Sequence, residues 1–367
     1  MRRVKIVVND FHLGKGMLLK DGTVNILEDF RYGRTFAEFL EYYRTGEYAD
    51  CEVELVINGD FLNLLQIDYL GIHTYLVTEK MIGHSVKAII AGHPEVFEAM
   101  RLFAEAPHHE IAYVIGNHDI GMLFDLPRKI LRDTVGRKLR FYDTYYEFDN
   151  VRIEHGHQHE AINATDPQKF ILRDPDYPEP VLNLPWASLF CAMFLPRIKK
   201  ERPFVDKVKP FTGYLRWALL HDTLFALRTG IYMGLSVMRM MLLARKHPLL
   251  DFNMSFARLK GTTIYPSFVK EARKILRNNP RLNSVIFGHT HVMRYRQWGG
   301  GKEYFNTGTW NEVTSLDIAD FGLQTILTYG FIELPPHGSG QRARIRLKEW
   351  KGQWRPEIET SLMPVGR

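Results

Sequence analysis

The stretch EIAYVIGNHD (110–119) decides how this chain of 367 residues is read. Its first six residues are mostly apolar and include β-branched side chains, which is typical of a buried strand. The strand is followed at once by GNHD, where an amide, an imidazole and a carboxylate are adjacent. Two earlier segments repeat this arrangement, because RVKIVVN (3–9) leads into DFH and VELVIN (53–58) leads into GD.

Helical patterns separate these strands. The segment 33–45 and the longer segment 76–106 have apolar residues at helical spacing. Strands that alternate with helices predict βαβ units and a mostly parallel sheet, hence an α/β fold. Ligands of such sheets bind outside the carboxyl ends of the strands. The polar groups at 10–12, 59–60 and 116–119 are expected at that edge.

The second half of the chain adds two more polar segments. Short strands are predicted across 138–155, a helix over 265–279, a strand over 284–288 and antiparallel strands within 292–350. EHGHQH (154–159) follows the first group of strands, and FGHTH (287–291) contains the end of the strand at 284–288.

Asp, Asn and His dominate all five polar segments. Carboxylate oxygen, amide oxygen and imidazole nitrogen are the ligands that hard and borderline divalent metals prefer. Asp10 and His12 are two residues apart, so on a strand exit they point the same way and reach one ion. The same spacing relates His289 and His291. In EHGHQH the first choice of ligand is His155 and the second is His157.

The composition limits the class of protein. Hydrophobic residues make up 45% and charged residues 25%, as in an ordinary soluble globular chain. The net charge of +6 suits an anionic partner without naming one. Only Cys51 and Cys191 are present, which excludes a disulfide framework and fits a reducing compartment. The apolar run in the first ten residues, MRRVKIVVND, is too short for a secretory signal. This segment is predicted to be the first strand. We therefore expect a cytoplasmic location.

Together the five segments follow the order DxH, GDxxD, GNHD, HG and GHxH. In this order the chain resembles the calcineurin-like metallophosphoesterase superfamily, over about residues 1–160 and 263–335, and NTGTW (306–310) is also similar to a sequence of that family. The resemblance implies a four-layer α/β-β-α sandwich formed by 1–160 and 263–352. It leaves a largely helical insertion at 161–262 and a tail at 353–367.

The resemblance also implies two divalent metal ions, with Mn²⁺ favoured over Fe, Zn, Co or Ni. Carried over residue by residue, one ion is held by Asp10, His12 and His291. The other is held by Asn117, His155 and His289, and Asp60 bridges the two. The ions share a hydroxide that attacks phosphorus. His118 stabilises the transition state or protonates the leaving oxygen.

One position departs from the family pattern. GDxxD reads GDFLN here, so Asn63 stands where a carboxylate often orients the histidine of GNHD. Asparagine accepts a hydrogen bond but carries no charge. Asp119, or a residue in the loop after Asn63, is a candidate substitute, and His157 is a further supporting residue.

The insertion is both apolar and basic. From 197 to 246 there are 11 Lys/Arg and 3 Asp/Glu, a surplus larger than the net charge of the whole chain. A membrane span needs about 20 apolar residues, and charged residues interrupt each candidate segment. Three readings remain: a helical cap packed on the catalytic domain, an interfacial helix pair that places 184–246 on an anionic membrane surface, or a lid for acyl chains.

A narrower resemblance favours a lipid. UDP-2,3-diacylglucosamine pyrophosphatases of lipid A synthesis also carry a helical lid after the HG motif, although they are shorter and usually have Arg where this chain has His118. This resemblance implies hydrolysis of a phosphodiester, pyrophosphate or phosphomonoester bond in a phosphorylated small molecule or lipid such as UDP-diacylglucosamine. The protein is then peripheral on the inner face of the membrane.

Two alternatives belong to other classes. A metal-dependent nuclease would use the basic insertion to follow phosphates, but the sequence contains no recognised nucleic-acid module or stacking platform. A non-catalytic metal-binding scaffold would not need the full set of ligands that the superfamily pattern requires.

Overall fold

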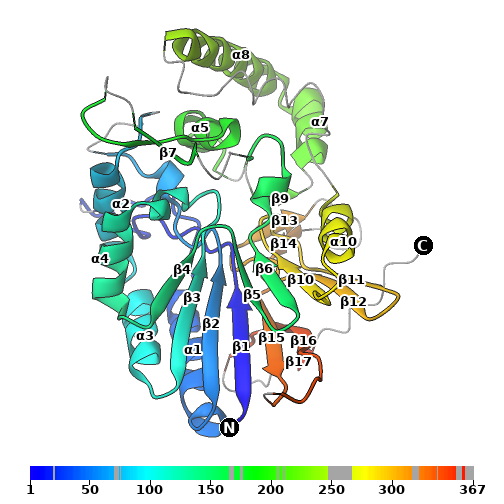
Figure 1. Cartoon of the computed structure of the whole chain (residues 1–367). Coiled ribbons are helices and arrows are strands. Elements are labelled where there is room, and N and C mark those ends of the chain that lie inside the picture. Colours follow the sequence, from blue (N-terminus) through cyan, green and yellow to red (C-terminus); the bar gives the residue numbers. More distant parts are fainter. Residues whose placement is uncertain are drawn as a thin grey trace.

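The computed structural model describes most of the chain. The described residues are 1–19, 21–69, 74, 76–164, 169–173, 177–203, 205, 207–209, 211–246, 267–315, 322–336, 338–352 and 358–359. Two sheets lie face to face, and helices cover their outer faces (Figure 1).

The larger sheet has seven strands in the order β17-β16-β15-β1-β2-β3-β4. Four of them are parallel: β1 (Arg3–Val8), β2 (Glu52–Asn58), β3 (His109–Val114) and β4 (Leu139–Tyr142). The others add antiparallel pairs beside β1: β15 (Thr328–Leu334), β16 (Arg344–Glu349) and β17 (Ile358–Glu359). The central strands are buried on both faces, which explains their nearly continuous apolar sequences.

Four helices cover the outer face of this sheet: α1 (Gly33–Arg44), α2 (Glu79–Gly92), α3 (Pro94–Glu105) and α4 (Asp125–Val135). The segment expected to be helical over 76–106 divides at His93, because Pro94 occupies the first turn of α3. Proline is accommodated there but would break a continuous helix. The apolar faces of these helices and of the sheet form the largest core.

The second sheet has the order β11-β12-β10-β6-β5. Its strands are β5 (Tyr145–Phe148), β6 (Val151–Glu154), β10 (Ser284–Phe287), β11 (Arg294–Trp298) and β12 (Lys302–Asn306). Val7, Val56 and Val114 of the first sheet pack against Ile153 and Ile286 of the second. Helix α10 (Phe268–Asn278) covers the outer face. The predicted four-layer α/β-β-α sandwich is confirmed. Within 292–350, β12 pairs parallel with β10, so the strands are not all antiparallel.

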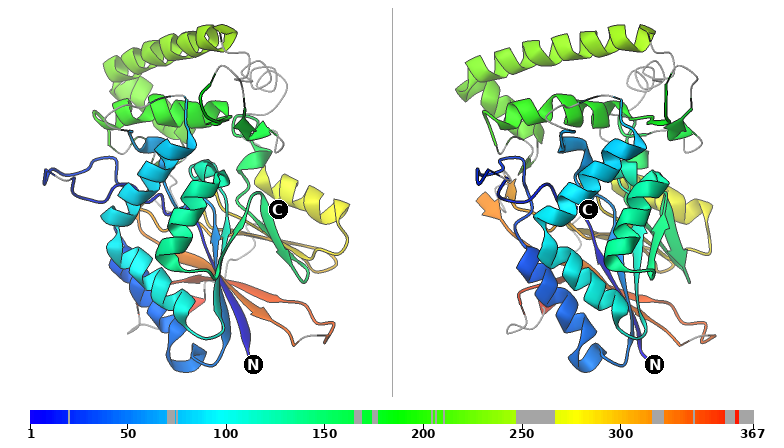
Figure 2. Two further views of the ribbon diagram at one scale, coloured as in Figure 1. Left: turned by 60° about the vertical axis from the view of Figure 1, so that its left-hand side comes forward. Right: turned by 90° about the vertical axis from the view of Figure 1, so that its left-hand side faces the viewer.

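The insertion lies beyond the carboxyl ends of the parallel strands (Figures 1 and 2). It contains β7 (Ile171–Leu172), β8 (Val181–Leu182), α5 (Trp186–Met193), α6 (Leu195–Lys199), β9 (Val208–Lys209), α7 (Phe211–His221) and α8 (Thr223–Lys246). β9 pairs with β13 (Val313–Ser315), which also pairs with β14 (Gly322–Gln324). Residues 247–262 of the predicted insertion lie outside the described residues.

Two further predictions concern the membrane and the tail. Among the described residues, no helix combines the length and the apolar character that crossing a bilayer requires. In the predicted tail, Ile358–Glu359 pair with β16, and the rest of 353–367 lies outside the described part of the chain.

Candidate metal centre

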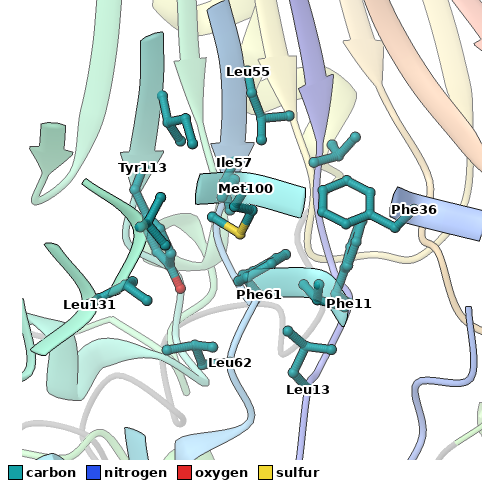
Figure 3. Close-up of a cluster of buried hydrophobic side chains, with 14 of the residues drawn as sticks. Phe11, Leu13, Phe36, Leu55, Ile57, Phe61, Leu62, Met100, Tyr113 and Leu131 are labelled. Carbon is teal, nitrogen blue, oxygen red and sulfur yellow. The ribbon is translucent and has the colours of Figure 1, made fainter. Parts of the chain in front are cut away.

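The predicted ligands come from turns that follow β1, β2, β3, β6 and β10 and meet at one edge of the two sheets. Apolar side chains that alternate with them fix these turns. Phe11 lies between Asp10 and His12, is fully buried, and stacks on Trp310 and Phe30 at ring-centroid distances of 5.0 Å. Phe61, next to Asp60, packs in the same cluster (Figure 3). The polar neighbours are therefore directed away from the core.

The backbone of these turns is unusual. Asp10, His12 and Asp60 have φ values of 56°, 52° and 51°, and His289 and His291 have 68° and 61°. The sequence suggested that strand alternation aligns Asp10 with His12. This explanation is wrong, because β1 ends at Val8. Both residues instead adopt left-handed conformations. Such conformations cost roughly 1–3 kcal/mol each for residues other than glycine, and they persist where surrounding contacts enforce them.

The NTGTW segment and the next residue, Asn311, supply many of those contacts. Thr309 Oγ1 donates to the carbonyl of Asp10 at 2.6 Å, and Asn311 Nδ2 donates to the carbonyl of Phe11 at 2.8 Å. Asn306 Nδ2 donates to the carbonyl of Gly288 at 2.6 Å. The backbone N–H of His289 donates to Asp10 Oδ2 at 2.8 Å. The first and last motifs of the chain are thereby joined through one loop.

The first group of ligands contains Asp10, His12 and His291, whose ligand atoms lie within 4.8 Å of one another. His12 Nε2 is 3.1 Å from His291 Nε2, and these atoms lie 3.7 Å and 3.4 Å from Asp10 Oδ1. Two imidazole nitrogens and one carboxylate oxygen thus face a common point, as the sequence predicted for one ion.

The second group contains Asp60, His155 and His289. His155 Nε2 is 3.1 Å from Asp60 Oδ2, which also lies 3.8 Å from His12 Nε2 of the first group. His155 Nδ1 donates to the carbonyl of Asn58 at 2.8 Å, so Nε2 is the ring nitrogen that faces the site. Asp60 therefore lies between the two groups, the position that the sequence assigned to a bridging ligand.

Three buried atoms show that these residues fit divalent cations. Asp10 Oδ1, Asn117 Oδ1 and His155 Nε2 have no hydrogen-bond partner among the described residues. A buried polar atom without a partner is costly, and a metal ion satisfies oxygen and nitrogen lone pairs of this kind. Although burial lowers the pKa of His155, the carboxylates of Asp60 and Asp10 raise it to about 10. The two carboxylates therefore favour positive charge at this position, whether it is a proton on His155 or a bound cation.

His157 lies behind His155. Its ring centroid is 5.4 Å from that of His155, and it belongs to none of the ligand groups found among the described residues. Burial, together with His155 and His289, holds the pKa of His157 well below its ordinary value, so the ring is neutral. The geometry favours His155 over His157 as a ligand.

Glu160 is a site residue that the sequence reading missed. Its Oε2 accepts a hydrogen bond of 2.9 Å from His289 Nε2, which leaves the Nδ1 lone pair of His289 for an ion. A carboxylate that orients a metal-binding histidine is a common second layer around metal sites. The signal in the sequence was the position of Glu160 directly after the HGHQH run.

His118 pairs with Asn63, not with Asp119. The distance from His118 Nδ1 to Asn63 Oδ1 is 2.9 Å. Asp119 instead accepts hydrogen bonds from the Tyr113 hydroxyl at 2.6 Å and from the backbone N–H of Phe61 at 3.0 Å. The sequence suggested that Asp119 takes over the role of the missing carboxylate and orients His118. This prediction is wrong, because Asn63 itself contacts His118. Asp119 supports the site by joining the turns after β2 and β3.

A cavity of about 660 Å³ opens over the centre. Its wall includes six predicted site residues: His12, Asp60, Asn117, His118, His289 and His291. The insertion contributes Ala187, Cys191 and Leu195 from α5 and α6. The volume is that of a small-molecule site.

No protein-family model and no curated protein matches the sequence. Solved structures that resemble the chain include a predicted phosphoesterase from Streptococcus pneumoniae TIGR4, with 10% identity, 98% of this chain and 99% of that chain covered and a TM-score of 0.30. A dimetal phosphatase from Danio rerio has 12% identity, 95% coverage of each chain and a TM-score of 0.35. Zn²⁺-complexed Vps29 from Entamoeba histolytica has 10% identity, 97% and 98% coverage and a TM-score of 0.29.

TM-scores this low carry no argument by themselves, and the description of the fold rests on the strand order and core of this chain. The resemblance to the calcineurin-like metallophosphoesterase superfamily rests on the order of the five sequence motifs. None of these three structures is described as a UDP-2,3-diacylglucosamine pyrophosphatase.

Proposed function

We propose that this chain is a dinuclear metal-dependent phosphoesterase. One observation carries the proposal: Asp60 lies between two groups of metal-ligating side chains, and members of both groups line one cavity. Bound divalent ions, Mn²⁺ first among the candidates, would neutralise phosphoryl oxygens and lower the pKa of water for attack on phosphorus.

The residues of the chain would prepare this reaction in distinct ways. Asp60 would serve both ion sites, and its carboxylate is held in place because Oδ1 accepts the backbone N–H of His118 at 2.8 Å while Oδ2 faces His155. The carbonyl of Asn58 fixes the tautomer of His155, and Glu160 fixes that of His289. The ligands are thus oriented before an ion binds, which lowers the cost of binding it.

His118 is the proposed contact to the substrate. Burial lowers the pKa of His118 to about 3, so its imidazole is neutral near pH 7. With Nδ1–H donated to Asn63, Nε2 carries a lone pair and is directed by a fixed hydrogen bond. A neutral ring orients the reacting groups, whereas donating a proton to the leaving oxygen would require an imidazolium that Asn63 does not stabilise.

The test uses bis-p-nitrophenyl phosphate and p-nitrophenyl phosphate with Mn²⁺, Zn²⁺, Fe²⁺, Co²⁺ or Ni²⁺. We expect metal-dependent turnover that EDTA abolishes and that Asn117→Ala removes, with the exposed Asn278→Ala as the matched control. Absence of turnover would overturn the proposal, and it would favour the metal-binding scaffold if elemental analysis still finds bound metal. Cleavage of single-stranded DNA that depends on Asn117, with no turnover of smaller esters, would favour the nuclease.

The outer surface of the insertion supports a more specific substrate class. Along α8, six apolar side chains at spacings of three or four residues are between 54% and 81% exposed: Leu224, Leu227, Ile231, Leu235, Met238 and Leu242. The opposite side of the helix packs inward through Phe225 and Tyr232. An apolar stripe of this length on a solvent-exposed surface indicates a binding partner that covers it.

Charge favours an anionic lipid surface as that partner. The sequence of α8 contains four Lys/Arg and no Asp/Glu, and that of α7 contains Arg216 and no acid. Asp222, between the two helices, is paired with Arg202. Two copies of so basic a helix would repel each other, whereas acidic headgroups attract it while the stripe enters the lipid. We therefore propose peripheral attachment through α7 and α8 and a phosphorylated amphiphile as substrate.

Flotation with liposomes tests this attachment. The full chain should float with vesicles of phosphatidylglycerol and phosphatidylcholine at low salt, and less with phosphatidylcholine alone. A variant with Leu227, Ile231 and Leu235 changed to Asn should stay at the bottom while it still hydrolyses small esters. A wild-type chain that never floats would overturn the lipid proposal and leave the phosphoesterase proposal standing.

A further inference from the structure

Three buried amide side chains line the cavity over the metal centre and have no part in the scheme above: Gln66, Asn163 and Asn311. Each of these residues is only 5% exposed. In each, the carbonyl oxygen of the side chain has no hydrogen-bond partner among the described residues. A buried carbonyl oxygen without a partner costs free energy, and a ligand in the cavity can supply the missing donor.

Asn163 is oriented by the same carboxylate that orients a proposed metal ligand. Its Nδ2 donates to Glu160 Oε2 at 2.5 Å, and this oxygen also accepts the hydrogen bond from His289 Nε2. A carboxylate oxygen accepts hydrogen bonds, so the nitrogen of the Asn163 amide must face it. Oδ1 of Asn163 is therefore the atom that is left for a ligand, and its position is coupled to that of His289.

The other two amides lie in loops beside the ligand turns. Asn311 Nδ2 donates to the backbone carbonyls of Asp10 at 3.1 Å and of Phe11 at 2.8 Å, so this amide also presents only its oxygen. Gln66 ends the short 3-10 helix η2 (Leu64–Gln66), which follows β2. Its side chain forms no hydrogen bond within the described part of the chain. All three amides thus border the space next to the metal centre.

The rest of the wall offers acceptors rather than positive charge. Lys207 is the one lysine or arginine that lines the cavity within the described residues, and its Nζ lies 3.2 Å from Asp29 Oδ1. Lys199 Nζ lies 2.9 Å from Asp29 Oδ2, so both ammonium groups of this Asp29–Lys199–Lys207 cluster are engaged by one carboxylate. Glu160 and Glu312 add two more carboxylates to the wall. Beyond the ion ligands, hydrogen-bond acceptors therefore predominate.

This composition suits the organic part of a substrate and not its phosphoryl group. Phosphoryl oxygens are acceptors and carry negative charge, so they do not pair with the carbonyl oxygens of amides. A hydroxyl group supplies the O–H that a neutral amide oxygen accepts. An ammonium group would instead be drawn to the charged carboxylates of the wall.

We propose that Gln66, Asn163 and Asn311 bind hydroxyl groups of the substrate next to the phosphoryl group held at the metal centre. This inference rests on the proposed phosphoesterase function and narrows its substrate class to phosphate esters of polyhydroxy compounds. The amide oxygens distinguish such an ester from a plain alkyl ester, because an alkyl chain leaves buried acceptors without donors.

Two phosphonates that differ only in hydroxyl groups test the inference. 3,4-Dihydroxybutylphosphonate and butylphosphonate have the same charge, the same carbon chain and a C–P bond in place of the ester bond. Their dissociation constants are measured by calorimetric titration of the full chain loaded with Mn²⁺. The parent chain should bind the dihydroxy compound about tenfold more tightly, equal to about 1.4 kcal/mol.

Variants of two of the amides should remove much of this preference. Gln66→Met and Asn163→Leu should each reduce it to about threefold or less. The dissociation constant of butylphosphonate should change less than about twofold, and the metal content found by elemental analysis should stay the same. Gln66→Glu removes the amide nitrogen but keeps acceptor oxygens, so it should retain the preference. The added charge acts on both phosphonates alike and cancels in their ratio.

Exposed amides provide the matched controls. Gln297→Met on β11 and Asn278→Leu on α10 should leave the ratio unchanged. An unchanged ratio in both cavity variants, or a parent chain that binds the two phosphonates equally, would overturn the inference. Loss of bound metal in the variants would also overturn it, because the amides would then serve the ions or their water. If Asn163→Leu unfolds at a lower temperature than the parent, Gln66→Met alone decides.

Binding without turnover separates this inference from the proposed function. A chain that hydrolyses no ester but keeps the preference for the dihydroxy compound would refute the phosphoesterase and retain the hydroxyl site. A chain that hydrolyses bis-p-nitrophenyl phosphate but does not discriminate between the phosphonates would do the reverse. A larger gain for 3-aminopropylphosphonate over propylphosphonate than for the hydroxyl pair would assign the wall to ammonium groups and overturn the choice of hydroxyl groups.

Discussion

The turns that hold the metal ligands and the helices α7 and α8 differ in almost every physical respect. In the turns, polar side chains are buried and the backbone has left-handed conformations, which hydrogen bonds from Thr309 and Asn311 enforce. In α8, apolar side chains are exposed and the backbone is regular. Each region departs from the rule that apolar residues lie inside and polar residues outside, but in opposite directions. Departures of this kind are expected where a protein meets a ligand.

Loss of the shared carboxylate should have the largest effect. Asp60→Asn keeps the size of the side chain but removes the charge between the two ligand groups. We expect kcat/KM for bis-p-nitrophenyl phosphate to fall by about 10³-fold or more, equivalent to about 4 kcal/mol of transition-state stabilisation. Elemental analysis should find fewer than two ions per chain. The exposed Asp133→Asn on α4 is the control, and two retained ions with full activity in Asp60→Asn would contradict the bridging role.

The backbone of the ligand turns should be nearly as sensitive. Gly59 has a φ of 80°, and a Cβ placed there would lie 2.5 Å from His155 Nδ1. Gly59→Ala therefore adds about 1–2 kcal/mol of backbone strain and displaces the ring of His155 from the carbonyl of Asn58. We expect a lower melting temperature and the loss of one ion.

A glycine on α8 provides the matched comparison. A Cβ at Gly234 meets nothing within 4 Å, and the residue lies inside a helix. Gly234→Ala should stabilise the chain by roughly 0.5–1 kcal/mol because alanine loses less backbone freedom in a helix. Equal melting temperatures for the two alanine variants would show that the turn does not need its left-handed glycine.

The partner of His118 should have a smaller effect, seen mainly in the pH profile. Asn63→Asp places a carboxylate beside Nδ1, and a paired charge raises the pKa of an imidazole by about 1–3 units. The fraction of charged His118 then rises as pH falls toward the new pKa. We expect turnover of esters with poor leaving groups to increase on the acidic side relative to the parent, while metal content stays constant. An unchanged ratio between poor and good leaving groups would exclude proton donation by His118.

The sequence predicted much of this arrangement because the determinants are local. Apolar strands that end in Asp, Asn and His identify both the sheet and its ligand edge, and the structure brings Asp10, His12, Asp60, His155, His289 and His291 into overlapping groups. Glu160 and the Asp29–Lys199–Lys207 cluster were missed because their partners are distant in sequence. No periodicity indicates that the carboxylate of Asp29 meets an ammonium group 170 residues further along the chain.

The sequence also did not predict how the side chains of Asp10 and His12 come to face the same point. The spacing of Asp10 and His12 suggested strand alternation, but the two residues follow the strand in left-handed conformations. The tertiary contact that enforces them comes from Thr309 and Asn311, near the other end of the chain. In the insertion, the sequence predicted the helices but not which of their faces is exposed. An apolar helical stripe has the same sequence pattern whether it is buried or exposed.

The smallest effect on folding should come from the outer face of α8. Changing Leu227, Ile231 and Leu235 together to Asn should alter the free energy of unfolding by no more than about 0.5 kcal/mol per site, since each side chain is already largely in water. On the inner face, Phe225 is only 6% exposed and packs with Phe194 and Ile198. Phe225→Asn should therefore cost about 3 kcal/mol or more. Chemical denaturation in the absence of lipid measures both. If the outer variant unfolds as easily as Phe225→Asn, the stripe is covered in solution by the chain itself or by another copy, and the difference between the two faces of α8 disappears.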